Sequence, residues 1–146
     1  MQQVNKKRII FYIVEYISIF IIGAIAYMAI EILWRGFTHW TMGILGGIVL
    51  ILVGLINEAD KDIPLMVQAP MASIIITLLE YYSGIILNIH LGLNIWDYSD
   101  LPLNVDGQVC LMYSLLWMIL GSIAVLLDDF VRWKIFKEPR KKTRLI

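Results

Sequence analysis

The run IIFYIVEYISIFIIGAIAYMAI, from Ile9 to Ile30, decides what kind of protein this is. It contains a single charged side chain, Glu15. The hydrocarbon core of a bilayer is about 30 Å thick, and an α-helix of about 20 apolar residues crosses it. The run therefore predicts a transmembrane helix.

Three further apolar runs follow, and the composition of the whole chain agrees with them. They cover Met42 to Ile56, Met66 to Ile89 and Val109 to Leu127. Of the 146 residues, 60% are hydrophobic and 16% are charged, whereas about a quarter of the residues in a soluble domain are charged. We predict an all-α, polytopic membrane protein, with one membrane domain over residues 1–146 and four transmembrane helices.

Positive charge is concentrated at the two ends of the chain. Three of the 12 Lys and Arg residues precede the first run and seven follow Asp129, so only Arg35 and Lys61 lie between. Four spans place both termini on one side, and the positive-inside rule makes that side the cytoplasm. We therefore expect a basic cytoplasmic tail over residues 130–146 and a short cytoplasmic loop over residues 57–65.

A cleaved signal peptide is an alternative interpretation of the N-terminal segment. Basic residues precede its apolar run, and Ala24-Ile25-Ala26 has the small-residue pattern of a cleavage site. The apolar run continues past this point to Leu33, which favours a membrane span.

Polar residues follow one face of the third run. Ser73, Thr77, Glu80, Gly84 and Asn88 fall within an arc of about 80° when successive residues are placed at helical spacing. An ionisable group at membrane depth is costly unless it faces protein or water, so this face should point into the bundle. Two interpretations stay open: hydrogen bonds that hold helices together, or a surface that faces a ligand.

Two other acidic positions lie nearer the cytoplasmic side. Glu15, in the inner third of the first run, could pair with a basic residue near the membrane face. Asp128 and Asp129 come at the inner end of the fourth run, close to Arg132, and we expect them at a solvated boundary.

The segment after the first run carries a second group of polar residues. If the first helix continues outward, Glu31, Arg35 and His39 lie at four-residue intervals on one face. Arginine binds phosphate or carboxylate as a fork, amides bind hydroxyls, and aromatic rings stack on or attract cations. We predict a substrate-binding pocket in the outer leaflet, formed by Glu31, Trp34, Arg35, His39, Glu80, Asn88, Trp96, Asp97, Tyr98, Asn104 and Gln108. The alternative is an interfacial aromatic belt with ordinary loop polarity.

Motifs for the common catalytic chemistries are missing from the sequence. It contains no G-x-x-x-x-G-K-[ST], H-E-x-x-H or G-x-S-x-G pattern. Cys110 is the only cysteine, and the spacing of His39 and His90 matches no metal signature. We expect no metal, no cofactor and no nucleic-acid partner. Catalysis on a lipid substrate stays open, with His39 and an acid as the base pair.

Several strings resemble one family of membrane proteins. They are W-R-G-x-T-H-x-T from Trp34 to Thr41, W-D-Y-S…P-x-N…G-Q from Trp96 to Gln108, LINE at 55–58 and LEYYSGIILN at 79–88. They resemble the small bacterial proteins of the ABC-transporter type IV, or CmpB-like, permease family over about residues 9–127. The resemblance implies a permease subunit in the bacterial inner membrane that works with a separate ATP-binding subunit.

Three functions remain open at this stage. The first is a non-enzymatic membrane subunit that binds a polar or amphipathic substrate among membrane lipids. Because four helices are few for a substrate pathway, it would need a homo-oligomer or a partner subunit. The second is a small membrane enzyme that acts on lipid or lipid-linked substrates. The third is a structural or regulatory partner of another membrane protein.

Overall fold

The computed structural model describes residues 2–59, 63–139 and 144–145. Its long helices are α1 (Gln2–Arg35), α2 (Trp40–Ala59), α3 (Leu65–Gly84) and α4 (Leu111–Lys134). A π-helix, η1 (Ile85–His90), continues α3, and two short strands, β1 (Asn104–Val105) and β2 (Val109–Cys110), precede α4. The predicted all-α class and the four helices are confirmed.

The helices have the dimensions that a bilayer requires. Among the described residues, three segments have the length and composition to cross a membrane: Asn5–Arg35, Leu65–His90 and Leu111–Lys134. The apolar part of α2, Trp40–Ile56, is shorter. The whole of α2 has 20 residues, which corresponds to about 30 Å.

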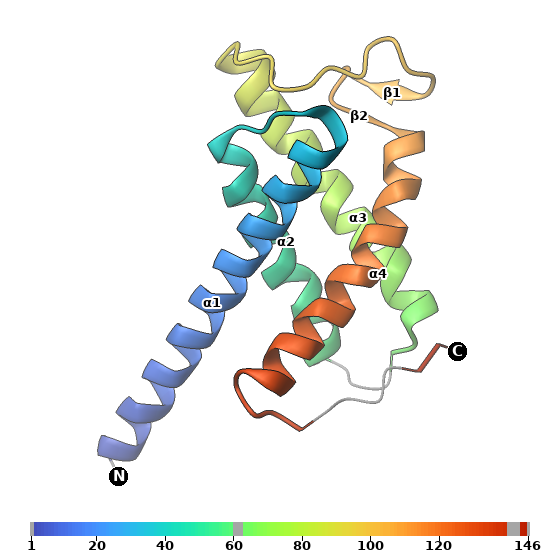
Figure 1. Cartoon of the computed structure of the whole chain (residues 1–146). Coiled ribbons are helices and arrows are strands. Elements are labelled where there is room, and N and C mark those ends of the chain that lie inside the picture. Colours follow the sequence, from blue (N-terminus) through green and yellow to red (C-terminus); the bar gives the residue numbers. More distant parts are fainter. Residues whose placement is uncertain (1, 60–62, 140–143, 146) are drawn as a thin grey trace.

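Successive helices run in opposite directions, so the start of α1 and the end of α4 lie at the same end of the bundle (Figure 1). We call this the inner end, following the predicted topology, and the opposite end the outer end. The centre of the predicted cytoplasmic loop, residues 60–62, and residues 140–143 of the predicted basic tail lie outside the described residues.

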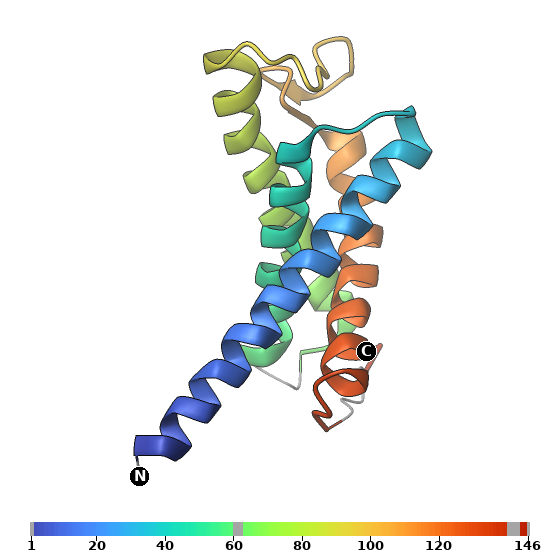
Figure 2. The same ribbon diagram turned by 60° about the vertical axis from the view of Figure 1, so that its left-hand side comes forward.

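Glycines allow α1 and α2 to pack closely. A Cβ on Gly47 would come within 2.6 Å of the Phe20 ring, and one on Gly23 within 2.7 Å of the Gly46 carbonyl oxygen. Close approach of this kind is how helices associate in a membrane. The N-terminal half of α1 leans away from the other helices (Figure 2), and Ile9, Ile13 and the neighbouring apolar side chains are about half exposed.

The main hydrophobic core lies among α2, α3 and α4. It contains Met42, Val49, Val53, Ala72, Ile76, Trp117 and Val125, each less than 10% exposed. The polar stripe of α3 faces this interior, as predicted, because Ser73, Glu80, Gly84 and Asn88 are all buried. At its inner half the stripe binds helix to helix: Ser73 donates to the Ser114 carbonyl oxygen (2.5 Å) and Thr77 to the Ser114 hydroxyl (3.1 Å).

At the inner end, a buried ionic cluster joins three helices. Arg132 of α4 pairs with Asp128 (2.8 Å), with Glu15 of α1 and with Glu58 of α2 (3.7 Å). The expected basic partner of Glu15 is thus Arg132. Glu15 and Asp128 are fully buried and Arg132 is 3% exposed. The prediction of a solvated boundary is therefore wrong for Asp128: its carboxyl group fills the space left by Gly54, where a Cβ would come within 2.6 Å of it.

The end of the chain reaches the start of α3. The carbonyl oxygens of Arg144 and Leu145 accept hydrogen bonds from the backbone amides of Leu65 (2.8 Å) and Met66 (3.3 Å). The first amides of a helix have no partner within the helix, so these two bonds satisfy groups that would otherwise be unpaired.

Candidate functional site at the outer end of the bundle

The outer end is covered by the loop over residues 91–103 and the β1–β2 hairpin that follows it (Figure 1). The two strands pair antiparallel, with Asn104 opposite Cys110 and Val105 opposite Val109. Asp106 and Gly107 turn the chain with φ of 53° and 68°. The sequence analysis did not predict this hairpin, because each strand has only two residues.

Arg35 joins the end of α1 to the covering loop. Its Nη2 donates to Glu31 at 2.6 Å, one helical turn earlier, and its Nη1 donates to the carbonyl oxygen of Ile95 at 2.8 Å. The second carboxylate oxygen of Glu31 accepts a hydrogen bond from the Thr38 hydroxyl. The helix ends here because Gly36, with φ of 81°, leaves the helical conformation. Both terminal nitrogens of Arg35 are thus occupied within the chain.

Asn88 and Gln108 organise the interior of the covering loop. The Asn88 amide nitrogen donates to the Trp96 carbonyl oxygen (3.0 Å) and to Gln108 Oε1 (2.9 Å), and its oxygen accepts from the Ile95 amide (2.7 Å). The indole of Trp96 donates to the Gln108 carbonyl oxygen at 2.9 Å. Asn88, Trp96 and Gln108 are buried, and the hydrogen bonds of the two amide side chains order the loop.

Asp97 and Asn104 shape the outer turns. Asp97 accepts from the Ser99 hydroxyl (2.6 Å) and from the Ser99 amide (2.9 Å). These two hydrogen bonds hold the pKa of the Asp97 carboxyl below its ordinary value. The Asn104 side chain donates to the Ser99 and Leu101 carbonyl oxygens and accepts from the Gly107 amide. Both side chains act within the loop.

Glu80 lies beneath the covering loop and is 3% exposed. One of its oxygens accepts from the Tyr98 hydroxyl (3.0 Å) and the other from the Trp117 indole (2.8 Å). Burial beside this carboxylate raises the pKa of the Tyr98 hydroxyl far above its ordinary value, so Tyr98 remains a hydrogen-bond donor.

A cavity of about 310 Å³ lies between the outer ends of α1 and α4, under the loop. Ligand pockets start at about this size. Five of the predicted site residues line it: Glu31, Trp34, Arg35, Trp96 and Tyr98. The rest of its lining is Tyr27 and Ile30 of α1 and Tyr113, Leu116, Trp117 and Leu120 of α4.

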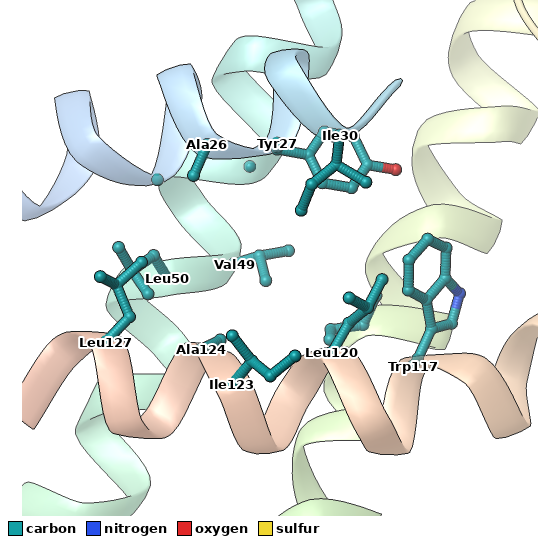
Figure 3. Close-up of a pocket in the computed structure, with 13 residues that line it drawn as sticks. Ala26, Tyr27, Ile30, Val49, Leu50, Trp117, Leu120, Ile123, Ala124 and Leu127 are labelled. Atoms are coloured by element: carbon teal, nitrogen blue, oxygen red, sulfur yellow. The ribbon is translucent and has the colours of Figure 1, made fainter. Parts of the chain in front are cut away.

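An apolar crevice of about 130 Å³ extends the cavity toward the inner end (Figure 3). The two spaces share Tyr27, Ile30, Trp117 and Leu120. Figure 3 shows Ala26, Tyr27 and Ile30 of α1 facing Ala124, Ile123 and Leu127 of α4, with Val49 and Leu50 of α2 behind. The two adjacent spaces are together called the groove between α1 and α4; both are lined mostly by apolar surface, and the charged side chains that line it, Glu31 and Arg35, lie at its outer end.

His39 is not among the residues that line this groove. Its Nδ1 lies 2.8 Å from the Thr41 hydroxyl, and its ring packs beside Trp40 with centroids 5.5 Å apart. His90 is exposed at the end of η1. No group of three or more His, Cys, Asp and Glu side chains suited to a metal ion occurs in the part of the chain that the structure describes.

The sequence analysis missed Tyr27, Tyr113 and Trp117 as lining residues. Tyr113 and Trp117 are four residues apart, so they share one face of α4. That spacing was a usable signal for a common face. Whether the face meets α1, lipid or α3 depends on how the helices cross, which spacing alone does not determine.

The helices and the groove define the class: a polytopic, all-α membrane protein with a cavity at one end of the bundle. The family model described as "Putative ABC-transporter type IV" matches residues 9–145, and the chain belongs to this family. No curated protein and no solved structure matches the chain.

Proposed function

We propose that the protein is a non-enzymatic membrane subunit of an ABC-type transport system and binds an amphipathic substrate in the groove between α1 and α4. Its place is the bacterial inner membrane, and its substrate enters from the surrounding lipid. The observation that carries the proposal is the groove itself, in which a cavity bordered by Glu31 and Arg35 shares four lining residues with an apolar crevice.

The shape of the groove suits a molecule with a polar head and an apolar tail. The head would lie in the outer cavity, where the described charged side chains are Glu31 and Arg35. The tail would lie against the apolar side chains of Ala26, Val49 and Leu120. The amides named in the sequence analysis would support the cavity from behind through the covering loop, without touching the substrate.

The transport role rests on the family and on the size of the bundle. Membership in an ABC-transporter family suggests an association with a separate ATP-binding subunit. Four helices enclose little space, and the N-terminal half of α1 exposes apolar side chains on several sides. A second copy or a partner subunit against α1 would complete a substrate pathway.

Photocrosslinking tests binding in the groove. A phospholipid with a diazirine in its acyl chain should label α1 and α4 of the protein in its native membrane, as mapped by mass spectrometry. Ala26→Phe, which fills the crevice, should reduce this labelling several-fold, whereas Ala29→Phe on the exposed side of the same helix should not. Equal labelling in the two variants would contradict the proposal.

Affinity purification tests the transport role. The protein isolated from its own host in mild detergent should retain an ATP-binding subunit in a fixed ratio. If lipid labelling is groove-specific but no ATP-binding subunit is retained, the binding site stands and the ABC-type transport role is wrong.

A further inference from the structure

The wall of the outer cavity is a continuous band of aromatic rings. Tyr98 and Tyr113 stack with centroids 4.6 Å apart, Tyr113 and Trp117 lie 6.4 Å apart, and Trp117 and Tyr27 lie 6.3 Å apart. Trp34 and Trp96 line the same cavity. Six aromatic side chains thus surround a space of about 310 Å³.

The polar tips of three of these rings are already occupied. The indole of Trp96 donates to the Gln108 carbonyl oxygen. Trp117 and Tyr98 both donate to the Glu80 carboxylate. These groups therefore have no proton to offer a ligand.

The charged side chains that line the cavity pair with each other. Arg35 donates through both terminal nitrogens, to Glu31 and to the Ile95 carbonyl oxygen, and its charge is paired with that of Glu31. Glu80 lies behind the aromatic wall, hydrogen-bonded to Tyr98 and Trp117, and is not among the residues that line the cavity. Among the described residues that line the cavity, Glu31 and Arg35 are thus the charged pair, and the aromatic wall is the feature that favours a cation.

We propose that the outer cavity binds an ammonium group, quaternary or primary, against its aromatic wall and beside Glu31. This inference rests on the proposed function, since it names the head of the amphiphile that the groove would hold. Aromatic surfaces with a nearby carboxylate are the usual recognition chemistry for such cations. The cation can belong to a lipid head group or to a free solute.

Native mass spectrometry of the full chain in neutral maltoside detergent tests the proposal. The probe is an equimolar mixture of phosphatidylcholine, phosphatidylethanolamine and phosphatidylglycerol with identical acyl chains. We expect the choline and ethanolamine lipids to form more adducts than the glycerol lipid by about fivefold, as for a partly buried cation on aromatic rings. Equal adducts for all three, or an excess of the glycerol lipid, would overturn the proposal.

Two matched pairs of variants locate the effect. Glu31→Gln frees Arg35 and should shift the preference toward the glycerol lipid, whereas Asp100→Asn in the exposed part of the loop should leave it unchanged. Tyr113→Leu removes a ring from the wall and should lower the preference, whereas Tyr82→Leu, 62% exposed and outside the cavity, should not. A preference that survives both cavity variants would overturn the proposal.

Tetramethylammonium added to the same mixture identifies the source of the cation. Displacement of the choline lipid supports ammonium recognition with a free solute as ligand, and an undisturbed preference supports a lipid as ligand. If Ala26→Phe reduces the number of lipid adducts but the three head groups form equal numbers of them, the ammonium site is wrong and the proposed function stands. If no lipid adduct survives in any form of the protein, both are wrong.

Discussion

At the scale of single residues, the outer end is organised by polar side chains whose hydrogen bonds go almost entirely to other groups of the same chain. Asn88, Gln108 and Glu80 are each less than 10% exposed and bind partners from two or more segments. A buried polar group without a partner costs about 1–3 kcal/mol. These residues should therefore be sensitive to any change that removes one partner and leaves the other in place.

Glu80→Leu should lower the stability of the protein by about 2–4 kcal/mol, because it leaves the buried Trp117 indole and the partly buried Tyr98 hydroxyl without an acceptor. Glu80→Gln keeps an acceptor for one of them and should cost less. Thermal unfolding can be followed with a thiol-reactive dye, since Cys110 is the only cysteine and is 2% exposed. An unchanged unfolding temperature for Glu80→Leu would contradict the assigned bonds.

From the hydrogen bonds that Ser99 donates to the Asp97 carboxyl, we predict a specific pH response of the covering loop. Hydrogen bonds from Ser99 lower its pKa below the ordinary value of 3.8, so the stabilisation they give is present above that value and is lost as pH falls through the lower, folded-state pKa. The protection of the Ser99 amide against exchange, relative to its intrinsic rate, should fall only below pH 3.8. In Asp97→Asn, whose side-chain oxygen can still accept from the Ser99 amide, this acid transition should be absent. An acid transition near pH 6 that persists in Asp97→Asn would contradict this assignment.

At the scale of elements, the packing of α1 on α2 and the β1–β2 hairpin each depend on a glycine that leaves room for neighbouring side chains. The ring of Phe20 lies where a side chain on Gly47 would be, and Asp97 and Ser99 lie where one on Gly107 would be. Glycine at these positions is required by neighbouring atoms, and at Gly107 by its φ of 68° as well.

Gly47→Leu should separate α1 from α2 and lower stability by about 1–3 kcal/mol, as overpacking commonly does. Ile44→Leu, on an exposed position of the same helix, is the control and should have little effect. The measurement is the unfolding temperature in detergent. An effect no larger than that of the control would show that α1 does not pack on α2 as described.

Gly107→Ala separates steric crowding from backbone strain in the hairpin. Gly92 has nearly the same φ, 64°, but no atom lies within 4 Å of its Cβ position. Gly92→Ala therefore reports the strain alone. Gly107→Ala should raise the rate at which maleimide labels Cys110 in the folded protein well beyond that seen with Gly92→Ala. Equal rates would contradict the crowding by Asp97 and Ser99.

The sequence predicts the helices more completely than it predicts the residues of the site. The spans follow from run length and hydropathy, and the Glu31–Arg35 pair follows from four-residue spacing in a helix. Burial of Asp128 did not follow, because it depends on Gly54 of another helix. The contributions of Tyr113 and Trp117 depend on where α4 crosses α1, and the two-residue strands are too short to have a periodic signal.

At the scale of the whole molecule, the antiparallel helices and the charge distribution lead to one orientation. The start of α1 and the end of α4 share one end of the bundle (Figure 1), and that end carries most of the Lys and Arg residues. We predict that this end faces the cytoplasm. The groove and the covering loop would then face the outer leaflet.

Cysteine labelling in intact cells tests this orientation. In a Cys110→Ala background, Leu103→Cys at the 72% exposed edge of the hairpin should react with a membrane-impermeant maleimide. Lys137→Cys, which is exposed beyond α4, should react only after the cells are permeabilised. The reverse pattern would place the groove on the cytoplasmic side.

The most direct test of amphiphile binding between α1 and α4 is a crystal structure of the protein grown in a lipid phase with a phospholipid brominated along its acyl chain. We predict anomalous peaks from bromine in the crevice beside Ala26 and Ala124, with the lipid head near Glu31. Peaks confined to the outer surfaces of the bundle, with the crevice closed by side chains, would contradict the account.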